Sequence, residues 1–228
     1  MTKKNDMNDF KKDKVIKAPS LVSKEICHLL SRYACLKKQV SPKIRRGNDP
    51  LAHIHREYCD PLMEVLLEEL TPKIETLTGL SLWPTLSFYY TYQKGNQLVV
   101  HKDRVSCEVV VALKIGSDES YKKKEGDWPL YFKNDNKSCH IVLEEGDALI
   151  MNGHELEHWR EPFKGDWFVS AIFGFVDKNS VHAYQKFDQR KQLGLPHIGF
   201  GRWYAKMQWE TLKQKWCKKK KLKLFKRA

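Results

Sequence analysis

The 228-residue chain lacks three features that would place it outside the cell or in a membrane. No run approaches the ~18 consecutive apolar residues of a membrane-spanning helix. The first residues, MTKKNDMNDFKKDK, contain no apolar stretch of the kind that directs secretion. The six cysteines form no C-x-x-C pair, which indicates free thiols rather than a disulfide framework. These absences predict an intracellular, cytoplasmic protein without a membrane span.

The composition is that of a folded but strongly basic protein. Hydrophobic residues make up 41% of the chain and aromatic residues 11%, which argues against disorder over most of its length. The net charge is +13, and KKKKLKLFKR at 218–227 contains no acidic residue. Such a tail can bind nucleic acid or an acidic membrane, or it can simply be a solvated end. Both interpretations imply non-specific contact with polyanions, so charge alone does not identify a substrate.

Two amphipathic helices are expected before residue 80. The first, SKEICHLLSRYACLKK, starts at Ser23 as N-cap and has apolar residues at the spacing i, i+3, i+4, i+7. These apolar residues are Ile26, Leu29, Leu30 and Tyr33. The second, DPLMEVLLEELTPKIETLTG, begins with Asp60 as N-cap and Pro61 at its first position, and it stops at Gly79. Pro72 is expected to kink this helix or split it in two.

Beyond Gly79 the pattern changes to short segments rich in β-branched and aromatic residues. They are TLSFYYTYQ (85–93), QLVVH (97–101), CEVVVALKI (107–115), WPLYF (128–132), HIVLE (140–144), DALIMN (147–152) and WFVSAIFGFV (167–176). Glycine-containing turn signals separate many of these segments, a pattern typical of an all-β sandwich or barrel. Because proline cannot donate to a strand ladder, Pro129 makes WPLYF an expected edge strand or rim segment.

The expected organisation is therefore mainly β with flanking helices. We expect a disordered basic N-terminus at residues 1–14 and one domain at 15–177, with helices at 20–79 and a β-core at 80–177. A basic helical extension and tail should follow at 178–228. The sequence contains no internal repeat.

Residues 154–158 match the H-E-x-x-H signature of zinc proteases. In those enzymes both histidines lie one turn apart on a long helix, beside a glutamate that acts as general base. Here the segment follows strand-like DALIMN and lies between Gly153 and Pro162, which leaves at most about two turns of helix. We therefore expect no zinc-protease site. His53 and His55, outside the expected β-core, are interpreted as structural or surface groups.

A better metal-binding pattern lies upstream, at His101-x-Asp103 between two expected strands. A histidine and a carboxylate two residues apart, together with a distant histidine, form the facial triad of non-haem Fe(II) sites. Three ligands on one octahedral face leave positions open for a co-substrate and O₂. The second histidine is expected at His158, directly before the chain re-enters the sheet, with His154 as the competitor.

Three motifs in the same order resemble the Fe(II)/2-oxoglutarate-dependent dioxygenases, in particular their prolyl-4-hydroxylase-like branch. Residues 92–103 are similar to Y-x-x-G-x(5)-H-x-D, residues 146–151 to G-D-A-L-x-F, and residues 158–166 to H-x-x-x-P-V-x-x-G-E/D. The resemblance covers about residues 20–177. It implies a double-stranded β-helix (jelly-roll) core braced by N-terminal helices. It also implies Fe(II) as metal cofactor, with 2-oxoglutarate and O₂ as co-substrates.

The sequence departs from this family at the 2-oxoglutarate anchor. The resemblance implies a Lys or Arg nine to eleven residues after the second histidine, but residues 167–169 are Trp-Phe-Val. Arg160 is the first alternative, because residues two apart on a strand point to the same side. Lys164 and Lys114 are the second and third alternatives. A buried carboxylate needs such a charge-assisted partner.

Three further assignments each have a simpler alternative. Arg160 could instead form a surface salt bridge with Glu157 or Glu161. Tyr92 matches a family tyrosine that faces the co-substrate, and it could equally be a core aromatic residue. Arg104 follows the expected metal ligand directly; it could orient that carboxylate or contact substrate, although such a residue is more often merely exposed.

The resemblance implies hydroxylation of a peptidyl or amino-acid side chain, so the expected partner is a protein, a peptide or an amino acid. Two alternatives remain open at this point. One is an oxidative demethylase or repair enzyme that acts on nucleic acid, although no clear base-stacking aromatic cluster is visible in a basic segment. The other is a non-enzymatic nucleic-acid-binding protein that uses the basic C-terminus. Fold and triad alone do not choose a substrate.

Overall fold

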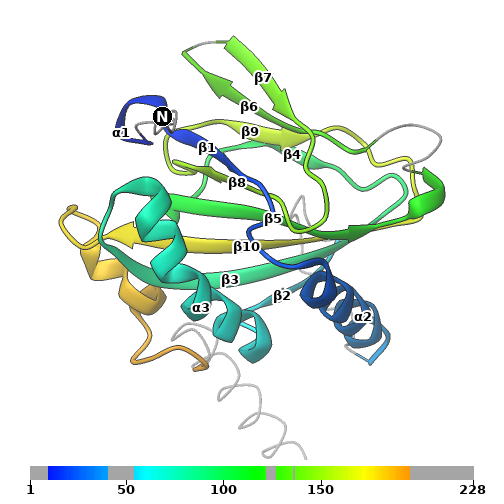
Figure 1. The fold of residues 1–228 in the computed structure, drawn as a ribbon, viewed down its shortest axis with the longest axis horizontal. Coiled ribbons are helices and arrows are strands. Elements are labelled where there is room, and N and C mark those ends of the chain that lie inside the picture. Colours follow the sequence, from blue (N-terminus) through cyan, green and yellow to red (C-terminus); the bar gives the residue numbers. More distant parts are fainter. Residues whose placement is uncertain (1–9, 41–53, 122–126, 136, 196–228) are drawn as a thin grey trace, which may run out of the picture.

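The computed structural model describes residues 10–40, 54–121, 127–135 and 137–195. Within these ranges the strands form two antiparallel sheets that face each other (Figure 1). No helix of this described part is long and apolar enough to cross a membrane. The basic tail at 218–227, the expected helix before it and His53 lie outside the described residues.

The large sheet has six strands in the described chain, in the order β1-β8-β5-β10-β3-β2. Their bounds are β1 (Val15–Ala18), β8 (Ala148–Met151), β5 (Val109–Ser117), β10 (Trp167–Asp177), β3 (Leu82–Gln93) and β2 (His55–Tyr58). The small sheet has the order β4-β9-β6-β7. Its strands are β4 (Leu98–His101), β9 (His158–Arg160), β6 (Leu130–Asn134) and β7 (Lys137–Ile141). The chain passes repeatedly between the sheets from β3 to β10, which is the double-stranded β-helix arrangement expected from the motifs.

Two helices cover the outer face of the large sheet, α2 (Lys24–Val40) and α3 (Pro61–Thr78) (Figure 1). The side chain of Asp60 caps α3 by accepting a hydrogen bond from the Leu62 amide at 3.1 Å. Gly79 ends the helix with φ 68°, a conformation that glycine adopts without strain. The buried stripe of α3 has helical spacing: Met63, Leu67, Leu70 and Ile74.

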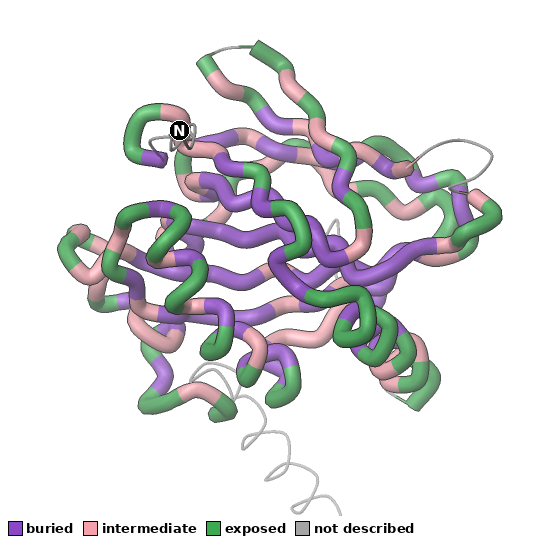
Figure 2. Tube along the Cα trace, viewed as in Figure 1, coloured by how far each residue is buried: buried purple, intermediate pink, exposed green. Residues whose placement is uncertain are grey.

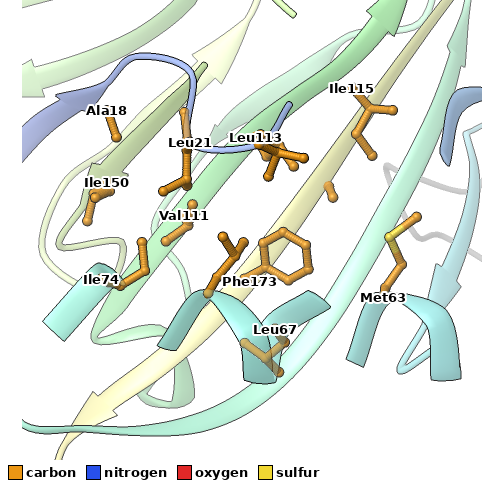
Figure 3. Close-up of a cluster of buried hydrophobic side chains, with 14 of the residues drawn as sticks. Ala18, Leu21, Met63, Leu67, Ile74, Val111, Leu113, Ile115, Ile150 and Phe173 are labelled. Atoms are coloured by element: carbon orange, nitrogen blue, oxygen red, sulfur yellow. The ribbon is translucent and has the colours of Figure 1, made fainter. Parts of the chain in front are cut away.

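Alternating side chains of the large sheet serve two separate cores. Val111, Leu113 and Phe173 point outward and pack with Leu67 and Ile74 of α3 (Figure 3). Their neighbours in sequence point inward, where they meet small-sheet residues in a second cluster. This inner cluster includes Leu86, Val110, Ala112, Leu130, Phe132, Leu149 and Met151. Both faces of the large sheet are therefore covered, and its central strands are buried along most of their length (Figure 2).

The structure corrects several expectations about individual elements. Helix α2 buries Cys27, Leu30 and Ala34, whereas Ile26 and Leu29 are exposed, so the expected apolar face was displaced by one position. Helix α3 is not split at Pro72, because the proline lies in the interior of one continuous element. The short strands β1 and β2 were not expected, whereas β9 lies where the chain was expected to re-enter the sheet. Strand β6, expected at an edge, pairs with β7 on one side and β9 on the other.

Both expected domain boundaries also differ from the structure. Residues Phe10–Asp13 form the short helix α1 with Phe10 buried, so order begins before residue 15. After β10, residues 178–195 remain packed on the domain and include the 3₁₀ segment η2 (Ala183–Gln189). Arg190 is buried there and donates to the Glu64 carboxylate at 2.5 Å and to the Thr85 carbonyl at 2.9 Å. The β-core therefore does not end the described domain at residue 177.

The buried Arg190–Glu64 pair generates a stability prediction. Arg190→Met should lower the free energy of unfolding by about 3–5 kcal/mol, because it leaves the Glu64 carboxylate buried without its cation. Lys178→Met is the matched control, since Lys178 pairs with Glu75 at 3.3 Å where both side chains are about one-third exposed. That change should cost no more than about 1 kcal/mol. Denaturant unfolding measures the free energy of unfolding of both variants. Equal losses of stability would contradict the conclusion that the buried Arg190–Glu64 pair matters more than the exposed Lys178–Glu75 pair.

Candidate metal centre

The candidate metal site is formed where β4 and β9 pair in the small sheet. Their antiparallel register places His101 directly opposite His158, and Asp103 follows two residues after His101. The Nε2 atom of His101 lies 3.6 Å from Asp103 Oδ1, and the Nε2 atom of His158 lies 3.7 Å from Asp103 Oδ2. One ligand atom from each residue can be chosen so that all three lie within 4.8 Å of one another. This is the donor set of a 2-His-1-carboxylate facial triad.

Backbone carbonyls orient both histidine rings. His101 Nδ1 lies 2.8 Å from the Val99 carbonyl oxygen, and His158 Nδ1 lies 3.0 Å from the Leu156 carbonyl oxygen. A carbonyl can only accept, so each Nδ1 carries a proton and donates it. In a neutral ring this leaves the lone pair on Nε2, which faces Asp103. The rings are therefore held in the tautomer that a metal ion requires.

The environment of the Asp103 carboxylate also fits a bound cation. Its Oδ2 atom is buried and has no hydrogen-bond partner among the residues that the structure describes. A buried carboxylate oxygen without a donor is costly. The amide of Asp103 donates to the Gly153 carbonyl at 2.8 Å, which holds the backbone while the side chain points at the two histidines. The donor set and this unsatisfied oxygen both fit a divalent metal ion.

The two histidines differ electrostatically. Burial lowers the pKa of His158 against the opposing attraction of the Asp103 carboxylate. Burial also acts to lower the pKa of His101, but its hydrogen bonds to Asp103 and to the Val99 carbonyl outweigh this and raise the pKa above its usual value. His158 is therefore a neutral ligand near pH 7.

The H-E-x-x-H segment forms no helix. Residues 152–157 make a turn, and His158 begins β9 beyond it. His154 is not a member of the triad. Its Nδ1 atom lies 3.4 Å from the Asp103 carbonyl oxygen, and its ring lies 5.5 Å from the ring of His182. The rejection of a zinc-protease site and the choice of His158 over His154 both agree with this geometry.

Gly153 is a functional position that sequence reasoning missed. A Cβ atom at this residue would overlap Asp103 Oδ2 and lie 2.7 Å from Val110 Cγ1. The residue therefore has to be glycine for the Asp103 carboxylate to keep its place. A glycine directly before His154 was the available signal, but nothing in the sequence shows which side chain approaches it.

Arg160 packs against a buried aromatic cluster and lies two residues after the triad residue His158. Its guanidinium lies 4.8 Å from the Trp128 ring centroid and 4.9 Å from that of Phe168. Nη1 donates to the Trp128 carbonyl at 2.6 Å, the single acceptor that the described residues provide. Burial lowers the pKa of Arg160 to about 10, so the group remains a cation at neutral pH. The alternative of a surface salt bridge is wrong, because Arg160 is only 4% exposed and Glu157 pairs with Lys133.

The other anchor candidates are placed differently. Lys114 of β5 is 1% exposed and already forms an ion pair with the Asp127 carboxylate. Lys164 lies on the surface. Tyr92 is buried with its ring 5.0 Å from Trp128, and burial raises the pKa of its hydroxyl to about 12 while the positive charge of Arg160 opposes this. Tyr92 and Arg160 thus lie in one buried cluster with Trp128, which belongs to the segment WPLYF that was expected to be an edge strand or rim segment.

Arg104 forms an ion pair with η2, the 3₁₀ segment that follows β10. Its Nη2 atom donates to the Asp188 carboxylate at 2.6 Å. Asp188, from η2, was not identified from the sequence. The suggested contact of Arg104 with substrate is therefore not what this geometry favours, because its charge is already compensated.

The triad generates a prediction about metal affinity. His101→Ala, Asp103→Ala and His158→Ala should each abolish tight Fe(II) binding, since each removes one of three ligands. His154→Ala should leave it unchanged, because His154 contacts only a backbone carbonyl of the site. Anaerobic titration with Fe(II) measures all four variants. Loss of iron in the His154 variant with retention in the His158 variant would reverse the assignment.

A second prediction concerns Gly153. Gly153→Ala should lower Fe(II) affinity by at least ~10-fold, because the added methyl group displaces the Asp103 carboxylate, and comparable disturbances of ligand orientation cost 10–100-fold. Gly95→Ala is the control, because a Cβ atom there meets nothing within 4 Å although its φ of +82° is also strained for alanine. Anaerobic iron titration with parallel thermal melting separates the two effects. An unchanged affinity in Gly153→Ala would show that the carboxylate can move without loss.

Comparison with known proteins identifies the fold. No protein-family model matches the sequence, and no curated protein matches it. Among solved structures, a Pseudomonas putida prolyl-4-hydroxylase matches with TM-score 0.58 and 14% identity, over 75% of this chain and 96% of that one. The 2-oxoglutarate-dependent epimerase SnoN from nogalamycin biosynthesis matches with TM-score 0.61 and 10% identity, over 83% and 89%. An oxidoreductase of the 2OG-Fe(II) oxygenase family from Burkholderia pseudomallei matches with TM-score 0.52 and 12% identity, over 73% and 85%.

These matches agree with the resemblance that the sequence motifs indicated. They are too distant in sequence to transfer a substrate. The chain has the double-stranded β-helix fold of the 2OG-Fe(II) oxygenases, and His101, Asp103 and His158 stand together in it as the candidate facial triad.

Proposed function

We propose that this protein is an Fe(II)- and 2-oxoglutarate-dependent oxygenase. The observation that carries the proposal is the triad: two correctly oriented histidines converge with an Asp103 carboxylate that has one buried, unsatisfied oxygen. His101, Asp103 and His158 would hold the iron. An iron ion bound there supplies the activation of O₂ for oxidation of a substrate, coupled to decarboxylation of 2-oxoglutarate.

Arg160 is the group we propose to bind the C5 carboxylate of 2-oxoglutarate. It is a buried cation with one carbonyl acceptor and no direct carboxylate pair among the described residues, although the Asp127 carboxylate lies near enough to stabilise its charge. An arginine can grip both oxygens of a carboxylate, which suits a dicarboxylic acid held by one end. Strand β9 carries Arg160 two residues after His158, so both side chains point to the same side of the strand.

The surroundings of Arg160 support this role over the other cations. Trp128 and Phe168 flank the guanidinium and exclude water, which strengthens any ion pair formed there. Tyr92 places a phenol in the same buried cluster and is the second group proposed to contact the co-substrate. Lys114 is compensated by Asp127, and Lys164 is exposed, so neither offers an unpaired buried charge.

The substrate we propose is a peptidyl or amino-acid side chain, hydroxylated as in the prolyl hydroxylases. Support comes from the three motifs shared with that branch and from the structural likeness to the Pseudomonas putida enzyme. The same fold also serves an epimerase and a carbocyclase from nogalamycin biosynthesis, so the fold itself does not select the substrate. Contact of the basic tail with polyanions, and a cytoplasmic location, remain predictions.

Succinate formation against 2-oxoglutarate concentration tests both the reaction and the anchor. The Fe(II)-loaded wild-type protein should form succinate in an uncoupled assay. Arg160→Ala should raise the 2-oxoglutarate requirement by at least ~10-fold, as expected for loss of a charge-assisted hydrogen bond worth ~1.5–3 kcal/mol. Arg160→Lys should fall between the two, because it keeps the charge and loses the fork. Fe(II) affinity should stay unchanged in both variants.

The exposed Lys164 provides the control for the succinate assay. Lys164→Ala should behave as wild type, since Lys164 lies on the surface. Unchanged kinetics in Arg160→Ala would make Lys114 the remaining buried candidate. Absence of succinate from the iron-loaded wild-type protein would contradict the proposed oxygenase function.

A further inference from the structure

A buried carboxylate outside the metal site is linked to the metal-binding loop. Asp188 of η2 is 1% exposed and accepts hydrogen bonds from two elements that are distant in sequence. One donor is the Tyr58 hydroxyl at the end of β2, and the other is Arg104 Nη2, at 2.6 Å. Arg104 is the residue next to Asp103. A single carboxylate therefore connects the C-terminal segment, the edge of the large sheet and the loop that carries the metal ligand.

The metal-binding loop is held from two sides. On one side, the Asp103 amide donates to the Gly153 carbonyl, which fixes the loop against the turn before β9. On the other side, Arg104 extends to Asp188. Farther along, the Thr85 hydroxyl donates to the Ser106 carbonyl at 2.6 Å. Two side-chain contacts thus act on the loop at the metal ligand: the short Arg104–Asp188 ion pair, and the longer approach of His154 Nδ1 to the Asp103 carbonyl oxygen at 3.4 Å.

The backbone around Asp188 shows that this position is strongly constrained. Phe187, Asp188 and Gln189 have φ angles of 53°, 54° and 59°, in the left-handed region that residues with side chains rarely adopt. Such a conformation persists only where surrounding contacts enforce it. Arg190 supplies one of these contacts by donating to Glu64, and Asp188 supplies the others. The segment is thus held in a strained shape with Asp188 pointing inward.

We propose that Asp188 is a positioning residue of the metal centre. Through Arg104 it fixes the backbone of the loop at Asp103 and so keeps the Asp103 carboxylate aimed at His101 and His158. This inference rests on the proposed function only in requiring that the triad bind a divalent metal. It assigns to residues 183–195 a part in the site, and it assigns to Arg104 an internal role in place of a contact with substrate.

The chemistry of the pair favours this role over a purely local one. Arg104 is 48% exposed at its side chain, whereas Asp188 is buried, so removing the arginine would take an ion-pair partner from a buried carboxylate. The guanidinium cannot leave Asp188 at low cost, and the loop that carries it cannot shift independently. Orientation of a ligand by such an outer contact commonly changes metal affinity by 10–100-fold.

Mn(II) affinity of the full-length chain tests the proposal, because it reports on the triad without turnover. Asp188→Asn and Arg104→Gln should each weaken Mn(II) binding by about 10-fold. The double variant should be no weaker than the weaker single variant, because both changes break the same link. Thermal melting of each variant shows whether it is folded at the temperature of the titration.

Tyr58→Phe is the control, since it removes the other hydrogen bond to the same carboxylate, together with the contact of that hydroxyl with Arg104, while the Arg104–Asp188 ion pair remains. It should lower thermal stability and keep Mn(II) affinity within about twofold of wild type. An Mn(II) affinity within about twofold of wild type in Arg104→Gln would overturn the proposal, even if Asp188→Asn fails to fold. If Asp103→Ala binds Mn(II) as well as wild type does, the triad assignment itself fails, and the positioning role fails with it.

Discussion

The register between β4 and β9 is the constraint on which the candidate site depends. It sets His101 opposite His158, and a slip of one residue would turn one ring to the other face of the sheet. Strand β9 has only three residues, but it pairs with β4 on one side and β6 on the other, where Phe132 lies opposite His158. Pairing with β4 and β6 therefore fixes the register of β9, which is too short to fix it by its own sequence pattern.

Strand β9 also explains why the cation of Arg160 is buried among aromatic rings. Residues two apart on β9 face one side, so a strand that presents His158 to the metal also buries Arg160. Lys114, on the facing sheet, is compensated by Asp127 within the protein. Arg160 is surrounded by Trp128 and Phe168, and no carboxylate of the described residues forms a direct ion pair with it. The difference between these two buried cations is that Lys114 has a direct carboxylate pair, which is why Arg160 is the one proposed to bind the co-substrate.

The sequence was sufficient for features that repeat locally or follow a motif. The long strands, the capped helix α3 and the triad could be predicted because periodicity, Asp60–Pro61 and H-x-D each carry a local signal. The short strands β1, β2 and β9 have four residues or fewer, too few to establish a period. Gly153, Asp127 and Asp188 were missed for another reason: their roles depend on partners that only tertiary folding brings near.

The end of the domain illustrates this limit. Apolar alternation stops at Asp177, and a boundary placed by hydrophobic pattern falls there. The structure continues through polar anchors instead: Arg190 binds Glu64 of α3, and Asp188 binds Arg104 beside the metal ligand. Buried charges of this kind persist only in pairs, so the residues before position 177 are incomplete without those after it. Residues 178–195 add little apolar surface to the domain. They nevertheless belong to it, because Arg190 and Asp188 supply the charges that pair with Glu64 and Arg104.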